Sequence, residues 1–190
     1  MDVAIPVATY VLQRTHRLRL LPLLLALVTV ACHGDERDFS GTVTRVFDGD
    51  SFIVTTIGRG EIEVRLRDID APEKDQPHAD VARAALMRMI DGRRVYVDVV
   101  DVDKFDRKVA KVYREPDRLD VIHTLVRDGH VWVNRRYAKD KALIALEERA
   151  RSQRLGLWAL PSEERIAPWE FRNLMFERQT TRKKTAHARQ

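Results

Sequence analysis

Short runs of alternating polar and apolar side chains fill residues 39–66, and this pattern constrains the fold more than any other feature. The run "SGTVTRV" alternates, "DGD" is a turn signal, and "SFIVTT" resumes the alternation. A second turn, "IGRG", leads into "EIEVRLRDI", which places Ile62, Val64 and Leu66 on one face. A period of two is typical of half-buried β-strands, so these residues predict a three-stranded meander.

The period changes to that of a helix in the segment "QPHADVARAALMRMIDGR". Pro77 suits the first turn of such a helix, and Gly92 ends it. Apolar side chains recur there at three- and four-residue spacing, namely Ala82, Ala85, Leu86, Met89 and Ile90. We interpret this stripe as core packing rather than as a binding surface.

Two more strands, "RRVYVDVVDVD" and "KVAKVYRE", precede a mainly helical region. The segment "LDVIHTLVRDG" predicts a short helix with Asp120 as its N-cap and Gly129 as its stop. The segment "KDKALIALEERARSQRLG" predicts an amphipathic helix with Leu143, Leu146 and Ala150 facing inward. This order predicts an α+β fold, a five-stranded OB-type β-barrel with about three packed helices.

Residues 1–31 have the features of a secretory signal peptide. Arg14, Arg17 and Arg19 precede "LLPLLLALVTVA", a stretch of apolar residues at positions 20–31. A membrane-spanning helix needs about 20 apolar residues, and this stretch is shorter. A basic start, a short apolar region and a small final residue instead predict export from a bacterial cytoplasm.

Cys32 directly follows that stretch and is the only cysteine of the chain, so no internal disulfide can form. The sequence "TVAC" resembles a bacterial lipoprotein box, although Thr29 stands where a larger aliphatic residue is usual. We favour lipidation of Cys32, followed by a linker over residues 32–38, which predicts a membrane-anchored lipoprotein. Cleavage after Ala31 without lipid, giving a periplasmic or secreted protein, is the competing interpretation.

The net charge of +5 comes from the two ends of the 190-residue chain. Residues 1–32 hold three Lys or Arg and one acid, and residues 172–190 hold six and one. The body, residues 33–171, therefore has 25 basic and 27 acidic residues. A nucleic-acid partner must then be held by local basic groups rather than by a broad positive field. The basic residues 173–190 predict a disordered tail.

Charged residues are concentrated where the predicted strands end. Asp48 and Asp50 flank Gly49 in the first turn, and "RLRDIDAPE" ends the third strand. The charged side chains that the barrel would bring to one rim are Asp50, Arg65, Asp70, Glu73 and Arg107. Carboxylates suit a hard cation such as calcium, and arginine binds phosphate oxygens. Cleavage of a phosphodiester needs both, plus a base to activate water.

Each of these elements has a structural explanation when taken singly. Asp-Gly is a common hairpin signal, and "DAPE" suits a loop that leads into a helix. Several motifs together are more specific: "VFDGDSFIV", "VRLRDIDAPE", "DKFDRKVAKV", "LVRDGHVWVNRRYAKD" and "PWEFR". In this order they resemble the staphylococcal nuclease family, and the resemblance runs from about Phe39 to Arg172.

The resemblance implies a thermonuclease-like domain over residues 39–172. It implies a calcium-dependent endonuclease that hydrolyses DNA and RNA with little sequence specificity and leaves 3′-phosphate ends. By the same resemblance, Asp50, Asp70 and the carbonyl of Ala71 bind Ca²⁺, and Glu73 is the general base. The remaining roles are the phosphate-binding arginines Arg65 and Arg107, and the contacts to terminal phosphate and nucleotide by Lys104 and Phe105.

Aromatic side chains suit a partner with unpaired bases, because stacking works with any base. Tyr137, beside Arg135 and Arg136, is the preferred surface candidate. For Trp132 we favour core packing over stacking on bases.

The sequence departs from the family pattern at three positions. Asp68 and Asp106 stand where the family usually has glycine, and Ser51 replaces threonine. A carboxylate at position 106 raises two possibilities, an ion pair with Arg107 that competes with phosphate or an altered loop backbone.

A different class of function is an OB-type nucleic-acid-binding module with weak or no catalysis. The presence of all five charged rim residues favours the enzyme over this alternative. The predicted partners are DNA and RNA substrates and a membrane surface bound through the lipid. No protein partner is predicted, and the chain is expected to be a monomer.

Overall fold

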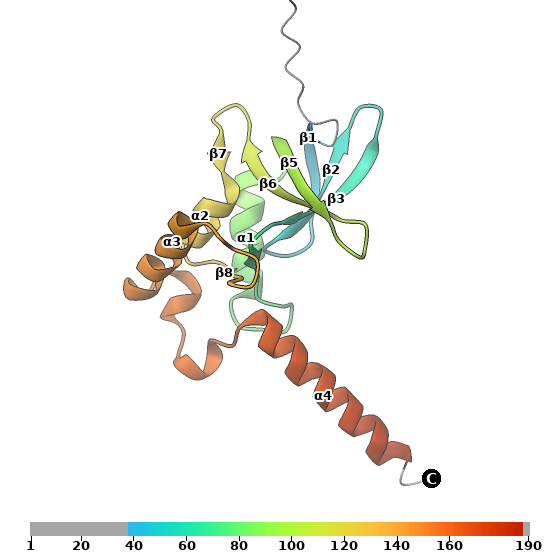
Figure 1. Ribbon diagram of the computed structural model, residues 1–190, viewed down its shortest axis with the longest axis vertical. Helices are drawn as coiled ribbons and strands as arrows, with labels where there is room; N and C mark the ends of the chain where they lie inside the picture. Colours follow the sequence, from blue (N-terminus) through green and yellow to red (C-terminus); the bar gives the residue numbers. More distant parts are fainter. Residues whose placement is uncertain (1–37, 188–190) are drawn as a thin grey trace, which may run out of the picture. The chain divides into compact units, whose positions relative to one another are not determined.

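The computed structural model describes residues 38–187, and Figure 1 shows how their elements are arranged. The predicted signal peptide, Cys32 and nearly all of the linker lie outside the described residues. In chain order the elements are β1 (Phe39–Val46), β2 (Ser51–Thr56), β3 (Gly60–Leu66), β4 (Ile69–Asp70), α1 (Ala79–Ile90), β5 (Arg94–Val102), β6 (Lys108–Arg114), β7 (Leu119–Asp120), α2 (Val121–Arg127), β8 (Trp132–Val133), α3 (Lys141–Ser152), the 3₁₀ helices η1 (Gly156–Ala159) and η2 (Ser162–Glu164), and α4 (Pro168–His187).

Five strands form a closed barrel in the order β3-β2-β1-β5-β6. Neighbouring strands are antiparallel, and a parallel pairing of β3 with β6 closes the barrel, with Val64 opposite Lys108. Alternate side chains point inward as the period of two requires, so Val54, Val64 and Val97 are fully buried. The predicted OB-type α+β fold is confirmed, and β1, β2 and β3 form the predicted meander.

The helices pack as the sequence patterns indicated. In α1 the buried side chains include Ala82, Leu86 and Ile90. The carboxylate of Asp120 accepts a hydrogen bond from the backbone N–H of His123, which caps α2 as predicted. Gly129 has a φ of 73°, the left-handed conformation that ends many helices. Helices α2 and α3 lie side by side (Figure 1).

The structure contains a fourth α-helix where a disordered tail was expected. Helix α4 begins at Pro168, and its later turns lead away from the barrel (Figure 1). The expectation is therefore corrected for residues 173–187. This segment contains neither glycine nor an internal proline and is rich in good helix formers, which explains its helical conformation.

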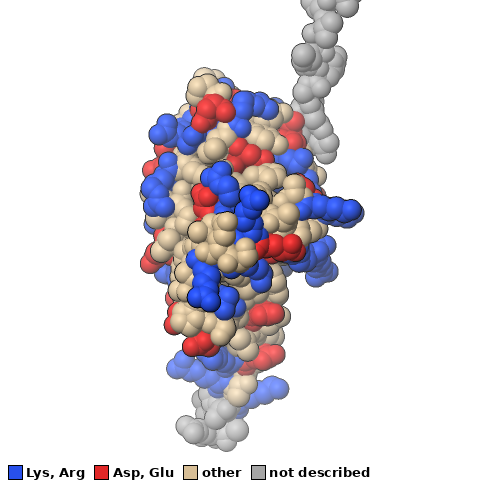
Figure 2. Space-filling view, turned by 90° about the vertical axis from the view of Figure 1, so that its left-hand side faces the viewer, with Lys and Arg blue, Asp and Glu red and all other residues tan. Residues whose placement is uncertain are grey.

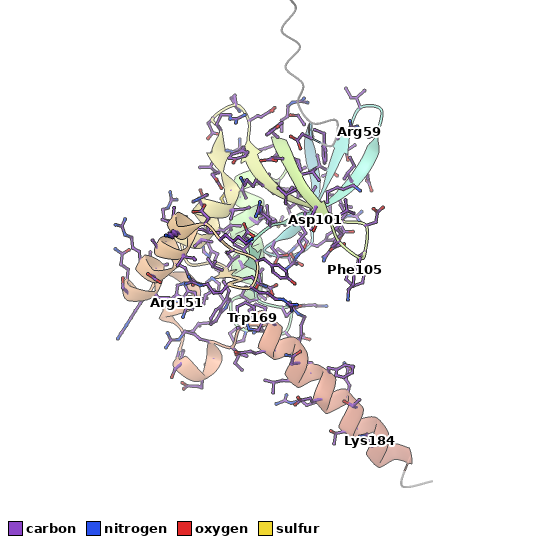
Figure 3. The ribbon with its side chains drawn as sticks, viewed as in Figure 1. Arg59, Asp101, Phe105, Arg151, Trp169 and Lys184 are labelled. Atoms are coloured by element: carbon purple, nitrogen blue, oxygen red, sulfur yellow. The ribbon has the colours of Figure 1, made fainter. Side chains whose placement is uncertain are left out.

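Three tryptophans attach the start of α4 to the rest of the domain. The ring of Trp132 meets that of Trp158 edge-on at 4.5 Å and that of Trp169 at 5.9 Å between centroids. Figure 3 shows Trp169 at the start of α4, where the helix meets the domain. Trp132 thus serves core packing, as the sequence favoured. Within the described part of the chain, the helices are too short or too polar to cross a membrane.

Candidate active site

A groove of about 700 Å³ opens at one end of the barrel, beside the β1–β2 turn and the β5–β6 loop. Its lining includes all of the residues that the sequence assigned to metal, catalysis and substrate, namely Asp50, Arg65, Asp70, Ala71, Glu73, Lys104, Phe105, Arg107 and Tyr137. The turns and strand ends therefore meet at one rim, as the barrel topology predicted. Cys32, the predicted lipidation site, lies outside the described residues.

The "DGD" turn delivers Asp50 to the floor of this groove. One carboxylate oxygen of Asp48 accepts hydrogen bonds from the backbone N–H groups of Asp50, at 2.9 Å, and Ser51, at 2.7 Å. A Cβ atom on Gly49 would lie 2.8 Å from the Cβ of Ala71, so the close approach requires glycine. Asp48 thus shapes the turn, as the sequence indicated.

The carboxylate of Asp50 is almost fully buried and has several hydrogen-bond donors. Its Oδ1 accepts from the hydroxyl of Ser51 and from Nη1 of Arg65, both at 2.8 Å. Its Oδ2 accepts from the backbone N–H of Ala71 at 2.8 Å. Burial nevertheless raises the pKa of Asp50 to about 7, with further contributions from Asp48 and Asp70 and an opposing one from Arg65.

Arg65 joins the two carboxylates that the family resemblance assigned to the metal. The pairing of β2 with β3 places Arg65 opposite Ser51, next to Asp50. Its Nη1 lies 2.8 Å from Oδ1 of Asp50, and its Nη2 lies 2.9 Å from Oδ1 of Asp70. The guanidinium therefore fixes the separation of the two acids and offsets part of their charge.

A short ribbon of two strands positions Asp70. Strand β4 pairs with β8, so that Asp70 lies opposite Trp132 and Ile69 opposite Val133. Glu147, on α3 and fully buried, accepts a hydrogen bond from the backbone N–H of Val133 at 2.8 Å. Its other oxygen lies 2.6 Å from Nη2 of Arg135. This buried carboxylate, which sequence analysis did not identify, therefore binds β8, and β8 in turn pairs with the strand β4 that carries Asp70.

Glu73 has a charged partner that sequence analysis also missed. The guanidinium of Arg172, on α4, forms an ion pair with Oε1 of Glu73. The same group lies 2.7 Å from Oδ2 of Asp70 through Nη2, and 3.2 Å from Oδ1 through Nη1. The motif "PWEFR" contributed only to the family resemblance in the sequence, and its last residue is a site residue in the structure.

The β5–β6 loop is organised by Asp103. One oxygen of this carboxylate accepts hydrogen bonds from the backbone N–H groups of Phe105, at 2.8 Å, and Arg107, at 3.1 Å. The other lies 2.7 Å from Nε of Arg107. These contacts, and above all the bond to the side chain of Arg107, hold the pKa of Asp103 below its ordinary value despite partial burial.

The two aspartates that stand at family glycine positions adopt left-handed backbone conformations. Asp68 has a φ of 63° and Asp106 a φ of 65°, which is the region where glycine is favoured. The carboxylate of Asp106 is 90% exposed and pairs with Lys108 at 3.2 Å. The sequence suggested that Asp106 could form an ion pair with Arg107 and compete with phosphate. In the structure Asp103 forms that ion pair instead.

Aromatic and basic groups border the same groove. Phe105 is exposed at the β5–β6 loop (Figure 3), with Nζ of Lys104 5.0 Å and Cζ of Arg107 5.5 Å from its ring centroid. Tyr137 is also exposed, and Cζ of Arg136 lies 5.6 Å from its ring centroid. These exposed rings suit stacking on unpaired bases. Figure 2 shows basic and acidic side chains interspersed over the face in view, in keeping with a body of nearly balanced charge.

The chemistry of the donor set fits a hard divalent cation. Asp50 and Asp70 supply oxygen donors next to the backbone of Ala71, and the raised pKa of Asp50 marks a carboxylate whose ionised form needs further positive charge. Among residues 38–187, no three His, Cys, Asp or Glu side chains form a ready-made metal cluster. A cation here would rely on two carboxylates and a carbonyl, and on water or substrate for its other ligands.

A closed OB-type barrel with buried acids, arginines and exposed aromatic rings in one groove carries the groups that an enzyme needs to cleave a phosphodiester bond. Comparisons with known proteins agree. The family model described as Staphylococcal nuclease homologue matches residues 63–160. Protein ParB of Escherichia coli is 36% identical over 144 residues, which cover 71% of this chain and 80% of that protein.

Two further relatives carry enzyme names. The micrococcal nuclease of Shigella flexneri is 35% identical over 144 residues, covering 71% of this chain and 81% of its own length. An uncharacterized endonuclease of Escherichia coli O157:H7 is 35% identical over 136 residues, covering 72% and 86%. The chain therefore belongs to the staphylococcal nuclease family and is a nuclease, a hydrolase.

Proposed function

We propose that this nuclease is a calcium-dependent endonuclease that hydrolyses DNA and RNA with little sequence specificity and leaves 3′-phosphate ends. The observation that carries the proposal is the arrangement of Asp50, Arg65 and Asp70 on the floor of the groove, with Glu73 beside them. Asp50, Asp70 and the carbonyl of Ala71 hold the calcium ion. When bound, the ion supplies positive charge beside the phosphate that is attacked.

The side chains of the chain itself supply the other steps. Glu73 accepts a proton from the attacking water through a carboxylate oxygen, a role that typically adds about 10²–10⁴ in rate. Arg65 and Arg107 bind phosphate oxygens, and they contribute most in the transition state, when the negative charge there is largest. In the structure the guanidinium of Arg107 is paired with Asp103. Arg107 must therefore break this ion pair in order to bind the phosphate of the substrate.

The bases are held by stacking rather than by readout of their edges. Phe105 and Tyr137 offer exposed rings, and Lys104 lies beside Phe105 to contact a terminal phosphate. Stacking is tolerant of base identity, which supports action on many sequences. Single strands present unpaired bases directly, so we expect them to be better substrates than duplexes.

Hydrolysis of single-stranded DNA by residues 33–190, with calcium and with chelator, tests the proposal. These residues form one compact unit. We expect calcium-dependent cleavage that Glu73→Gln lowers by about 10²-fold or more, with 3′-phosphate ends identified by mass spectrometry. DNA binding without hydrolysis at any calcium concentration would instead identify the chain as a binding module.

We also propose that the protein is an exported monomer, anchored to a membrane surface by lipid on Cys32. The basic and apolar residues 14–31 and the sequence "TVAC" support this proposal. Expression in a bacterium with labelled palmitate tests it: the label should enter the wild type and not the Cys32→Ser variant. Sedimentation of residues 33–190 at the mass of one chain would support the monomer.

A further inference from the structure

The segment Ile166–Arg172 contacts the loop that carries Glu73 at two separate places. The first contact is made by Gln76, which is nearly buried. Its Oε1 accepts a hydrogen bond from the backbone N–H of Glu73 at 2.8 Å, and its Nε2 donates to the carbonyl of Ile166 at 2.8 Å. The backbone of the Glu73 loop is therefore attached to the residues just before α4.

The second contact fixes the side chain of Glu73. This carboxylate is 37% exposed and would otherwise sample several rotamers at the edge of the groove. The guanidinium of Arg172 pairs with it and, through both of its terminal nitrogens, with Asp70. A planar fork with donors in fixed directions is suited to hold two carboxylates in a defined relation.

The same contact has an electrostatic consequence at Asp70. Oδ2 of Asp70 lies 2.7 Å from Nη2 of Arg172, so the cationic side chain forms an ion pair with one of the proposed calcium ligands. Two cations on one carboxylate repel each other. Arg172 should therefore orient Glu73 and at the same time weaken the binding of calcium.

We propose that Arg172 is a positioning residue of this nuclease, which holds Glu73 in the groove and lowers the affinity of the neighbouring metal site. The proposal rests on the calcium-dependent function proposed above. It makes two predictions of opposite sign for one substitution, and damage to the fold would not give that combination.

The experiment compares Arg172→Gln, Arg172→Lys and Arg178→Gln with the wild type, all as the full chain in detergent. Arg178 is the matched control, because it lies on the same helix and is not part of the groove lining. Calcium affinity is measured by calorimetry without substrate. The kcat for single-stranded DNA is measured at saturating calcium, and urea unfolding gives the stability of each variant.

For Arg172→Gln we expect calcium to bind about tenfold more tightly and kcat to fall about 10- to 100-fold. For Arg172→Lys we expect a calcium affinity close to that of the wild type, since the charge remains. Its kcat should be intermediate, since one ammonium group cannot reproduce the fork. Arg178→Gln should match the wild type in calcium affinity and kcat.

Two results would overturn the proposal for Arg172. One is an unchanged kcat in Arg172→Gln, and the other is a calcium affinity that is unchanged or weaker. A failure of the calcium proposal is distinguishable, because the wild type itself would then bind no calcium in the calorimeter. In that case the kcat comparison, repeated with whichever divalent cation supports cleavage, still decides whether Arg172 positions Glu73.

Discussion

The carboxylate of Asp103 lies 2.7 Å from the guanidinium of Arg107 in the loop between β5 and β6. The aspartate does two things at once, because its other oxygen accepts the backbone N–H groups that shape the loop. The arginine that the family resemblance assigns to phosphate is thus held by a carboxylate of its own loop. In the function proposed above, the substrate phosphate would compete with that carboxylate for Arg107.

Asp103→Asn should separate these two effects. The asparagine oxygen can still accept the backbone N–H groups, whereas the anionic partner of Arg107 is gone. We expect the KM for single-stranded DNA to fall severalfold. Stability should fall by about 1–2 kcal/mol, since a partly buried hydrogen bond to a charged group is lost. Steady-state kinetics and urea unfolding check both parts. A KM equal to or above that of the wild type would contradict this account of the loop.

The pKa of Asp50 predicts how stability depends on pH without metal. In the folded protein this pKa is raised from 3.8 to about 7, mainly by burial. Between these values the folded state keeps a proton that the unfolded chain has released, so stability from this group is lost as the pH rises through 7. Arg65, Asp48 and Asp70 face the carboxylate and remain in place in Asp50→Asn.

We therefore expect the free energy of unfolding of the wild type to fall relative to that of Asp50→Asn as the pH rises from 4 to 8 in chelator. Urea unfolding at several pH values measures this difference, in which the titration of carboxylates remote from Asp50 cancels. A difference that stays constant over this range would show that Asp50 has an ordinary pKa.

Glu147 is expected to stabilise the fold and to support the site from a distance. Glu147→Ala removes the acceptor of the Val133 N–H and leaves a cavity, which should cost about 2–4 kcal/mol of unfolding free energy. The neighbouring Glu148 is an exposed residue whose carboxylate lies 4.0 Å from Arg135, so Glu148→Ala should change stability by less than about 0.5 kcal/mol. Urea unfolding of both variants gives the comparison, and equal effects would argue against a special role for Glu147.

Asp106→Gly should be neutral to stabilising. The left-handed backbone at this position costs an L-residue about 1–2 kcal/mol, and glycine removes that cost. Glycine also gives the unfolded chain more conformational freedom, which offsets part of the gain in stability. The pair with Lys108 is exposed and contributes little. We expect a gain of about 0.5 kcal/mol in thermal or urea unfolding. In Asp68→Gly the gain should be smaller, because Asp68 also pairs with Arg67 at 2.6 Å.

Much of this site was predictable because it is built at the ends of strands. Alternation fixed which segments were strands, and the order of strands brought Asp50, Arg65 and Asp70 to one rim. The family resemblance then pointed to the same side chains. The cap at Asp120 was also readable, because capping is a local interaction between residues a few positions apart.

Arg172 and Glu147 could not be found in this way, because their roles depend on contacts that local sequence does not specify. Arg172 is 102 residues from Asp70 along the chain, and no periodicity relates the two. Glu147 lies on the inner face of α3 with Leu143 and Ala150, yet a charged residue on an apolar face is ordinarily assumed to reach solvent. The extent of α4 was missed because charge and polarity were read as disorder, although the residues have good helix propensity.

The separation of Arg172 from Asp70 along the chain also sets an order of events during synthesis. At about 5–20 residues per second, on the order of 5–20 s separate the translation of Asp70 from that of Arg172. For most of that interval the nascent chain contains Asp70 and Glu73 but not the guanidinium of Arg172 that pairs with both. The ion pair of Arg172 with Glu73 can therefore form only after the strands of the barrel have been synthesised.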